Sequence, residues 1–194
     1  MATTKKKSTH QSGALDGKAG IVGAAVAGLA VGIAANLGRK AIVQGMTAVS
    51  GDWADGLTAE HAATSKIFDG LEQTTEADSA KRTVMLTQLK HALGKHAFQE
   101  ENVVYPAMRE HGLTEEADHL NHDHGYVKQF LFDLTEMERD DIEWLPKVRK
   151  FRAELDEHIR EEEDTLFPKL HAALGTEGNA HVTAAMNKEG FKLA

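Results

Sequence analysis

Two segments of this chain, 62 residues apart, share one pattern of residues. Residues 96–106 read HAFQEENVVYP and residues 158–168 read HIREEEDTLFP, so both follow H-x-x-x-E-E-x-x-x-aromatic-P. Side chains four residues apart lie on the same face of a helix, so each copy places a histidine beside a glutamate. A pattern written twice indicates a duplicated structural unit.

The sequence from about residue 52 onward is typical of helices. The chain has only 3 prolines and lacks alternating β-branched residues, so strands have no support. Polar or glycine-containing breaks separate four amphipathic segments, which we expect to be helices over residues 53–73, 79–110, 114–137 and 141–174. Thr114 is the expected N-cap of the third helix. Because short links join these segments, the sequence predicts an all-α, up-down-up-down four-helix bundle.

Each segment has a stripe of apolar residues at steps of three and four, which a helix in a bundle buries. The second stripe also contains a His and a Glu, and the fourth stripe contains the same pair 62 residues later. The first and third stripes each contain one His, at an offset of 63. The chain therefore consists of two helical hairpins that direct six polar side chains inward, namely His61, His96, Glu100, His124, His158 and Glu162.

Other polar residues near these positions have competing interpretations. His119 and His122 flank His124, but neither keeps the apolar stripe or the 63-residue offset. Acids beside the inward positions could accept hydrogen bonds from imidazoles, or lie on the surface in water. These acids are Glu60, Glu101 and Glu163.

The six inward side chains predict a metal site. A lone carboxylate in a bundle core costs roughly several kcal/mol in desolvation, so two carboxylates there need a shared cation. The chain has no cysteine, so nitrogen and oxygen must hold any metal. Imidazoles and carboxylates suit iron or manganese, with zinc as an alternative. If Glu100 and Glu162 bridge two ions, coordination positions stay open for water, oxide or a small molecule.

The arrangement His61, His96-x-x-x-Glu100-Glu101, His124, His158-x-x-x-Glu162-Glu163 resembles the hemerythrin-like family, also called HHE cation-binding domains, over about residues 53–174. The resemblance, to the bacterial non-haem di-iron type, implies two iron ions with the four histidines as terminal ligands and the two glutamates as bridges. Classical oxygen-carrying hemerythrins differ, because they are expected to have a second His at the position of Glu162 or its counterpart. Ferritin-like bundles are the second architectural interpretation, but their ligand helices carry E-x-x-H.

Three classes of function are compatible with such a centre. The resemblance favours a sensor or reservoir that binds O2, nitric oxide or peroxide. The alternatives are a di-iron enzyme that reduces peroxide or nitric oxide, and an iron-storage protein. No organic substrate is expected, because no cofactor motif is present. No nucleic-acid partner is expected either, because the net charge is −8 and phosphate binding requires a basic face.

Residues 1–50 differ from the rest of the chain in charge. They hold six Lys or Arg against the single acid Asp16, so the remaining residues carry a net charge of −13. Within this arm, Ala19–Gly38 has no charged residue, and twenty helical residues span about 30 Å, enough for a bilayer core. Twelve of the twenty are Ala or Gly, which weakens the hydrophobic drive.

We therefore expect an additional N-terminal Ala/Gly-rich helix with three open roles. It could associate with a membrane through residues 19–38, pack on the body or in an oligomer, or be a cleaved secretory signal. The predicted domains are the arm at 1–50, the bundle at 51–174, and a loose tail or short extra helix at 175–194. We expect a cytoplasmic protein, with membrane association open and no oligomeric state predicted.

Overall fold

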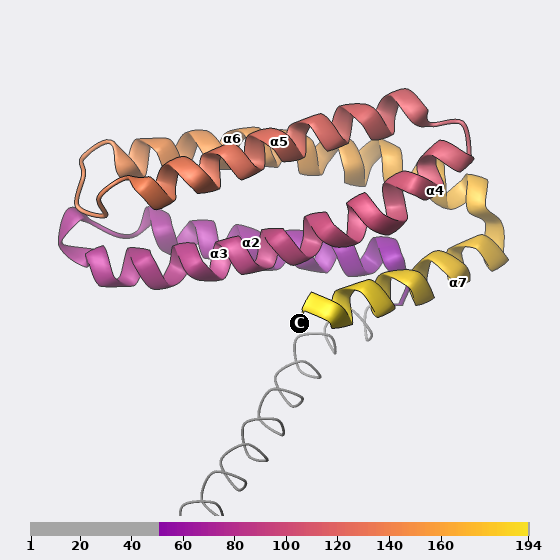
Figure 1. The fold of residues 1–194 in the computed structure, drawn as a ribbon, viewed down its shortest axis with the longest axis horizontal. Helices are drawn as coiled ribbons and strands as arrows, with labels where there is room; N and C mark the ends of the chain where they lie inside the picture. Colours follow the sequence, from indigo (N-terminus) through magenta and orange to yellow (C-terminus); the bar gives the residue numbers. More distant parts are fainter. Residues whose placement is uncertain (1–50, 194) are drawn as a thin grey trace, which may run out of the picture. The chain divides into compact units, whose positions relative to one another are not determined.

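The computed structural model describes residues 51–193, and these residues form an all-α structure without any strand (Figure 1). Within this part of the chain, no helix is long and apolar enough to cross a membrane. The predicted Ala/Gly-rich helix at residues 19–38 lies outside the described residues, so its three roles stay predictions.

The predicted four-helix bundle is confirmed, and its helices run alternately up and down (Figure 1). The second and fourth predicted helices each continue through a short π-helical turn, labelled η2 and η3, and a 3-10 turn, η1, precedes the second. The elements are α2 (Trp53–Glu72), η1 (Glu76–Asp78), α3 (Ser79–Gln99), η2 (Glu100–Val104), α4 (Tyr105–Glu110), α5 (Thr114–Glu136), α6 (Trp144–Glu161), η3 (Glu162–Leu166) and α7 (Phe167–Leu193).

The N-cap expected at Thr114 is wrong. Leu113 occupies the cap position of α5, and no side chain there accepts a hydrogen bond from the first turn. Leu113 is 5% exposed and packs in the core. The link at positive-φ Gly112 therefore serves to bury an apolar side chain, and Thr114 becomes the first residue of the helix.

The buried apolar side chains form two separate clusters. One contains Trp53, Phe167 and the residues around α4. The other contains Phe68, Trp144 and Phe151 near the opposite ends of the same helices. Along all four long helices, the inward His and Glu residues fall between members of the two clusters. The apolar clusters therefore enclose a polar layer from both sides and keep it out of bulk water.

The two π-helical turns change the register of the bundle. A π-helical turn contains one residue more than an α-helical turn, so the stripe of inward residues moves on by one position. In η3, steps of three and four from Glu162 lead to Thr165, which is exposed, whereas Leu166 and Phe167 are buried. In η2, Val103 and Val104 are both buried. The spacing of three and four therefore fails after Glu162, whereas after Glu100 it still reaches the buried Val103.

Residues 176–193, expected as part of a loose tail or short extra helix, form the second part of α7. The backbone turns at Gly175, where φ is +61°, a conformation that favours glycine. Beyond the turn, the side-chain amide of Asn179 donates to the carbonyls of His171 and Gly175 at 2.9 and 2.7 Å. Its oxygen accepts from Nε1 of Trp53 at 2.8 Å, which ties the end of α7 to the start of α2.

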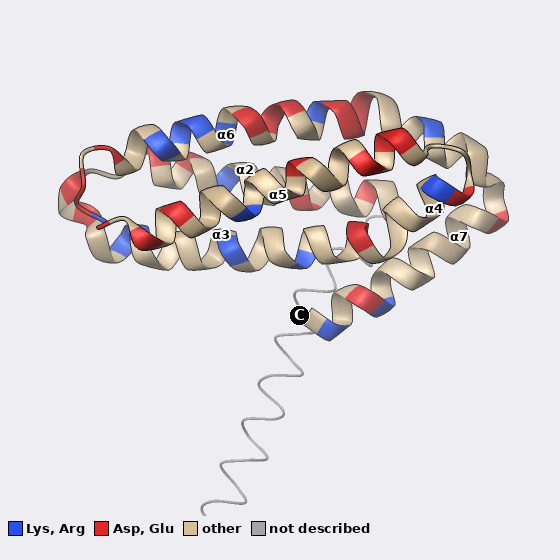
Figure 2. Cartoon of the chain, turned by 45° about the horizontal axis from the view of Figure 1, so that its top comes forward, with Lys and Arg blue, Asp and Glu red and all other residues tan. Residues whose placement is uncertain are grey.

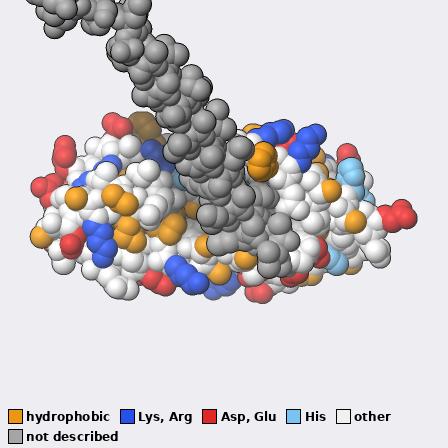
Figure 3. Space-filling model, turned by 90° about the horizontal axis from the view of Figure 1, so that it is seen from below, with side chains coloured by type: hydrophobic (Ala, Val, Ile, Leu, Met, Phe, Trp, Pro, Cys, Tyr) orange, Lys and Arg blue, Asp and Glu red, His pale blue; other side chains and the backbone are white. Residues whose placement is uncertain are grey.

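The surface of the described residues carries both signs of charge. Figure 2 shows Lys or Arg and Asp or Glu along α6. Arg152 on this helix contacts Asp69 at 2.8 Å and Glu72 at 3.1 Å, joining α6 to α2. The face seen in Figure 3 has hydrophobic side chains scattered among charged ones. Ion pairs near the surface, such as those of Arg152, each contribute about 0 to 1 kcal/mol, so the buried apolar clusters stabilise the bundle more than these pairs do.

Candidate metal centre

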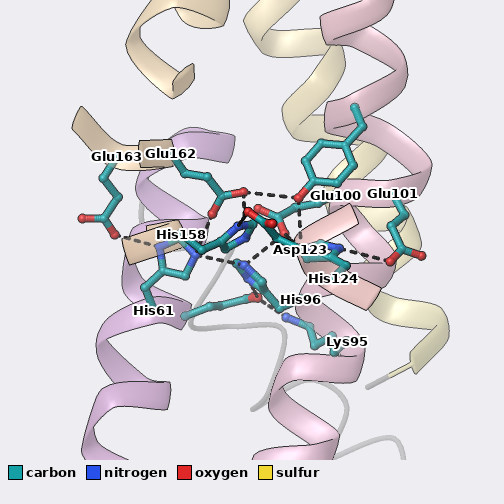
Figure 4. Close-up of polar contacts among 12 residues, drawn as sticks. His61, Lys95, His96, Glu100, Glu101, Asp123, His124, His158, Glu162 and Glu163 are labelled. Atoms are coloured by element: carbon teal, nitrogen blue, oxygen red, sulfur yellow. Dashed lines mark hydrogen bonds and ion pairs between the residues drawn. The ribbon is translucent and has the colours of Figure 1, made fainter. Parts of the chain in front are cut away.

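The structure brings all six predicted site residues together in the polar layer (Figure 4). The four histidines are between 2% and 6% exposed, and the two glutamates are completely buried. α2 and α5 each supply one His, while the other two His residues lie in the last turns of α3 and α6. The six residues are His61, His96, Glu100, His124, His158 and Glu162.

The first half of the centre is formed by His61 and His96. Their Nε2 atoms lie 2.9 Å apart. Nε2 of His96 is 3.1 Å from Oε2 of Glu100, and Nε2 of His61 is 3.4 Å from Oε2 of Glu162. One nitrogen or oxygen from each of these four residues fits within a span of 4.8 Å, so the group could hold a cation.

The second half is formed by His124 and His158. Nε2 of His124 is 3.3 Å from Oε2 of Glu100, the oxygen that also faces the first half. Nε2 of His158 is 3.3 Å from Oε1 of Glu162. Each carboxylate therefore faces one imidazole from each half, as two bridging carboxylates would.

The π-helical turns begin at the two glutamates. Glu100 is the first residue of η2, and Glu162 is the first residue of η3. Turns of this kind are frequent at functional sites because the extra residue re-aims side chains. Tyr105-Pro106 and Phe167-Pro168 follow directly, and the prolines restart the α-helix without needing a backbone donor.

Each imidazole also contacts an acid through its other ring nitrogen. Nδ1 of His61 donates to Glu163 at 2.7 Å, and Nδ1 of His124 donates to Glu101 at 3.1 Å. The other two acids contact the His of a neighbouring helix. Glu60, next to His61 in the sequence, accepts from His96 at 3.3 Å, and Asp123, next to His124, accepts from His158 at 3.4 Å. A proton on Nδ1 leaves the lone pair on Nε2, which is the tautomer that binds a metal.

The imidazoles therefore donate to Glu60, Glu101 and Glu163, which confirms one of the two interpretations of these acids. Asp123 was missed, although it stands 63 residues after Glu60, the same offset that relates His61 to His124. Applying that offset to the acids would have found it.

Charges within the layer shift several pKa values of the metal-free chain. Burial works against the charged form of His124, but the carboxylates of Glu100 and Glu101 beside it raise its pKa to about 9. Burial likewise opposes ionisation of Glu60, yet His96 and Lys95 lower its pKa to about 2. The pKa of Glu100 is also low, because nearby imidazoles outweigh its burial. Glu60 and Glu100 are therefore ionised in the metal-free layer.

Several atoms in the layer have no hydrogen-bond partner. They are both oxygens of Glu100, Oε2 of Glu162 and Nε2 of His158. Imidazole nitrogens and carboxylate oxygens of this layer lie at ion-pair distance from each other. The contacts of these atoms do not have hydrogen-bond geometry. Buried lone pairs that converge without donors are compensated by cations, and this set of nitrogens and oxygens fits iron.

Tyr105 breaks the symmetry between the two halves. Its hydroxyl lies 3.0 Å from Nε2 of His124 and donates to Oε1 of Glu162 at 3.3 Å. Burial and the charges of Glu100 and Glu162 raise the pKa of this phenol well above its usual value, so it remains protonated. The equivalent residue 62 positions later is Phe167, whose ring stacks on that of His61 with centroids 6.2 Å apart.

The other histidines near the centre lie outside it. His91 and His122 are exposed, and Nε2 of His119 contacts Glu161 at 3.3 Å on the surface. His119, Asp123 and Glu161 form a second group of possible ligands, but its members are exposed or half-buried. The offset rule therefore selected His124 correctly as the inward residue.

A bundle with a buried layer of four imidazoles and two carboxylates defines a class of helical metal-binding proteins. The model of the hemerythrin HHE cation-binding domain matches residues 54–170, and the chain belongs to this family. An uncharacterized hemerythrin-like protein of Schizosaccharomyces pombe is 26% identical over 138 residues, which cover 69% of this chain and 66% of that protein.

A second relative is a DNA nickase of a Nostoc species. It is also 26% identical over 138 residues, covering 71% of this chain but only 39% of the nickase. No solved structure matches the chain. Family membership and the buried cluster together support a non-haem iron-binding role.

Proposed function

We propose that the chain holds two iron ions in the polar layer and binds O2, nitric oxide or peroxide there, as a sensor or reservoir. His61 and His96 would hold one ion and His124 and His158 the other, with Glu100 and Glu162 bridging. The support is the contact of each carboxylate with both halves. Bound iron would supply coordination positions and electrons for a small ligand.

A small cavity beside the imidazoles supports the choice of a small ligand. A cavity of about 10 Å³ lies against the four imidazoles, and none of its lining residues is a carboxylate. Leu93, Ala97, Val127, Leu155 and Ile159 supply apolar walls. A space of this size admits about one water-sized molecule, and apart from the imidazoles and Thr64 its walls offer no hydrogen bonds. A diatomic molecule suits it better than any organic substrate.

An apolar pocket lies beside this cavity. The pocket has a volume of about 220 Å³ and shares Leu93, Ala97, His124 and Val127 with the small cavity. Lys128, whose side chain is 62% exposed, lines its outer part. A neutral gas could therefore reach the imidazole side of the layer along apolar walls.

The test is spectroscopic. We would purify the full chain without oxygen, load it with ferrous iron, and record visible spectra on adding nitric oxide, O2 or peroxide. A stable adduct that reverses when the gas is removed would support the sensor or reservoir. If the loaded chain gave no spectral change with any of the three, the proposal would be wrong.

The hydroxyl of Tyr105 favours a second candidate, an enzyme that reduces peroxide or nitric oxide. Such reductions consume protons, and this protonated phenol lies within 3.3 Å of two predicted ligands. Rapid consumption of substrate with accumulating product, instead of a stable adduct, would favour the enzyme. The net charge of −8 does not favour phosphate binding, so nicking of DNA, the action named for the Nostoc relative, is not expected of this chain.

A further inference from the structure

We infer that Tyr105 makes the two halves of the centre inequivalent and that it does so through the carboxylate of Glu162. This inference rests on the proposed pair of iron ions. In the sequence the two halves are copies, and in the structure their imidazoles and carboxylates have matching contacts. The phenol hydroxyl is a polar group that one half has and the other lacks.

The two carboxylates differ in the hydrogen bonds that they accept. Oε1 of Glu162 accepts from the hydroxyl of Tyr105 at 3.3 Å. Neither oxygen of Glu100 accepts a hydrogen bond. The residue that corresponds to Tyr105 is Phe167, which is 3% exposed and presents only its ring to His61. Glu100 therefore receives no phenol donor from its side of the bundle.

The position of the hydroxyl assigns it to one half. It lies 3.0 Å from Nε2 of His124, and Oε1 of Glu162 lies 3.3 Å from Nε2 of His158. A cation on His124 would occupy the lone pair of Nε2, so the hydroxyl would keep Glu162 as its acceptor. A carboxylate oxygen that accepts a hydrogen bond donates less electron density to a metal. The ion beside His124 and His158 becomes the more electron-poor of the two.

Tyr105 is thus a positioning residue that selects where the exogenous ligand binds. An electron-poor ion is the stronger Lewis acid, so a peroxide or other anionic ligand would bind first at the His124–His158 half. The outer acids Glu60 and Asp123 also differ between the halves, but the Tyr-for-Phe difference is the one that places a donor on a bridging carboxylate.

Mössbauer spectroscopy of the full chain loaded with enriched iron tests this directly. Inequivalent ions give two quadrupole doublets of equal area, whereas equivalent ions give one. Tyr105→Phe removes one oxygen, keeps the ring, and should bring the doublets closer together while iron content stays the same. Phe167→Tyr should also reduce the difference, and the exchange of both residues should restore it.

The exchange variant separates this role from a structural one, because damage to packing would not restore the separation of the doublets. An unchanged separation of the doublets in Tyr105→Phe, or a single doublet in the unmodified protein with two irons, would overturn the inference and leave the proposed function standing. Failure of the unmodified protein to bind paired iron would overturn both. If Phe167→Tyr does not fold, Tyr105→Phe still decides.

Discussion

Oδ2 of Asp123 lies 3.4 Å from Nδ1 of His158, although Asp123 precedes a different histidine, His124, in the sequence. Glu60 has the same relation to His96 and His61 in the other hairpin. These acids therefore tie α5 to α6 and α2 to α3 at the level of the centre. Each orients the imidazole of its neighbouring helix and keeps its Nε2 aimed inward.

Removing the charge of Asp123 should weaken metal binding. Asp123→Asn leaves the size of the side chain unchanged but replaces an acceptor that fixes the tautomer of His158, and we expect iron affinity to fall about 10-fold to 100-fold. Competition with a chelator measures this. Asp164→Asn makes the same chemical change at an exposed position beside the centre and should have no effect. Equal affinities of the two variants would show that Asp123 does not orient His158.

Much of the fold and of the centre was predictable from the sequence. The stripes of α2, α3 and α5 lie where steps of three and four place them, because regular α-helices keep that spacing. The inward direction of His61, His96, His124 and His158 followed from the same spacing together with the duplication. Whether these residues bind metal remains a prediction.

What the sequence did not predict depends on local departures from regular geometry or on contacts between helices. The exposed Thr165 follows from the π-helical turn at Glu162, which no residue pattern indicated. Trp53 and Trp144 begin two antiparallel helices and lie in different apolar clusters, which no stripe within one helix could indicate. The hydroxyl contacts of Tyr105 required the positions of two other helices to be known.

Filling the small cavity should block the ligand and spare the iron. Ala97 lines both the cavity and the apolar pocket. Ala97→Val adds two methyl groups there, and we expect the nitric oxide adduct to form more slowly by about tenfold, while overpacking costs about 1 to 3 kcal/mol of stability. Stopped-flow absorption measures the rate.

Ala92→Val provides the matched control for this variant. Ala92 lies on the same helix, is half-buried, and lines neither space. It should leave the rate unchanged. An Ala97→Val rate equal to that of Ala92→Val would mean that the ligand reaches the centre by another route.

The stability of the metal-free protein should depend on pH in a way that the loaded protein does not share. The pKa of His124 is raised from 6.5 to about 9 in the folded chain, despite its burial, by Glu100 and Glu101. A raised folded-state pKa stabilises the protein fully below pH 6.5, and this contribution is lost as pH rises through about 9. Iron requires the neutral imidazole and so removes the dependence.

Calorimetry of both forms checks this expectation. Between pH 6.5 and 9 the melting temperature of the metal-free chain should fall relative to that of the loaded chain, so the gap between the forms should widen. A constant gap over this range would show that protonated His124 does not stabilise the metal-free fold.

Arg82 should stabilise the bundle far from the centre. Its guanidinium is completely buried, donates to Oγ1 of Thr74 at 2.9 Å and to the carbonyl of Arg139 at 2.6 Å, and lies 5.0 Å from the ring centroid of Trp144. Arg82→Ala should lower the free energy of unfolding by about 3 to 5 kcal/mol, because two buried acceptors and a cavity are left. Exposed Lys81→Ala should cost less than about 0.5 kcal/mol.

Denaturant unfolding of the two variants measures these costs. Iron content per folded chain should be normal in both, since Arg82 lies beside the apolar cluster of Trp144 and outside the polar layer. Equal unfolding free energies for Arg82→Ala and Lys81→Ala would contradict the role given to the buried guanidinium.

The central claim is that Glu100 and Glu162 are buried because two cations neutralise them. Elemental analysis of iron per chain, on anaerobically loaded protein with and without the paired changes Glu100→Ala and Glu162→Ala, tests it most directly. We predict two irons per chain in the unmodified protein and loss of the pair in the double variant. Two irons per chain in the double variant would contradict the claim.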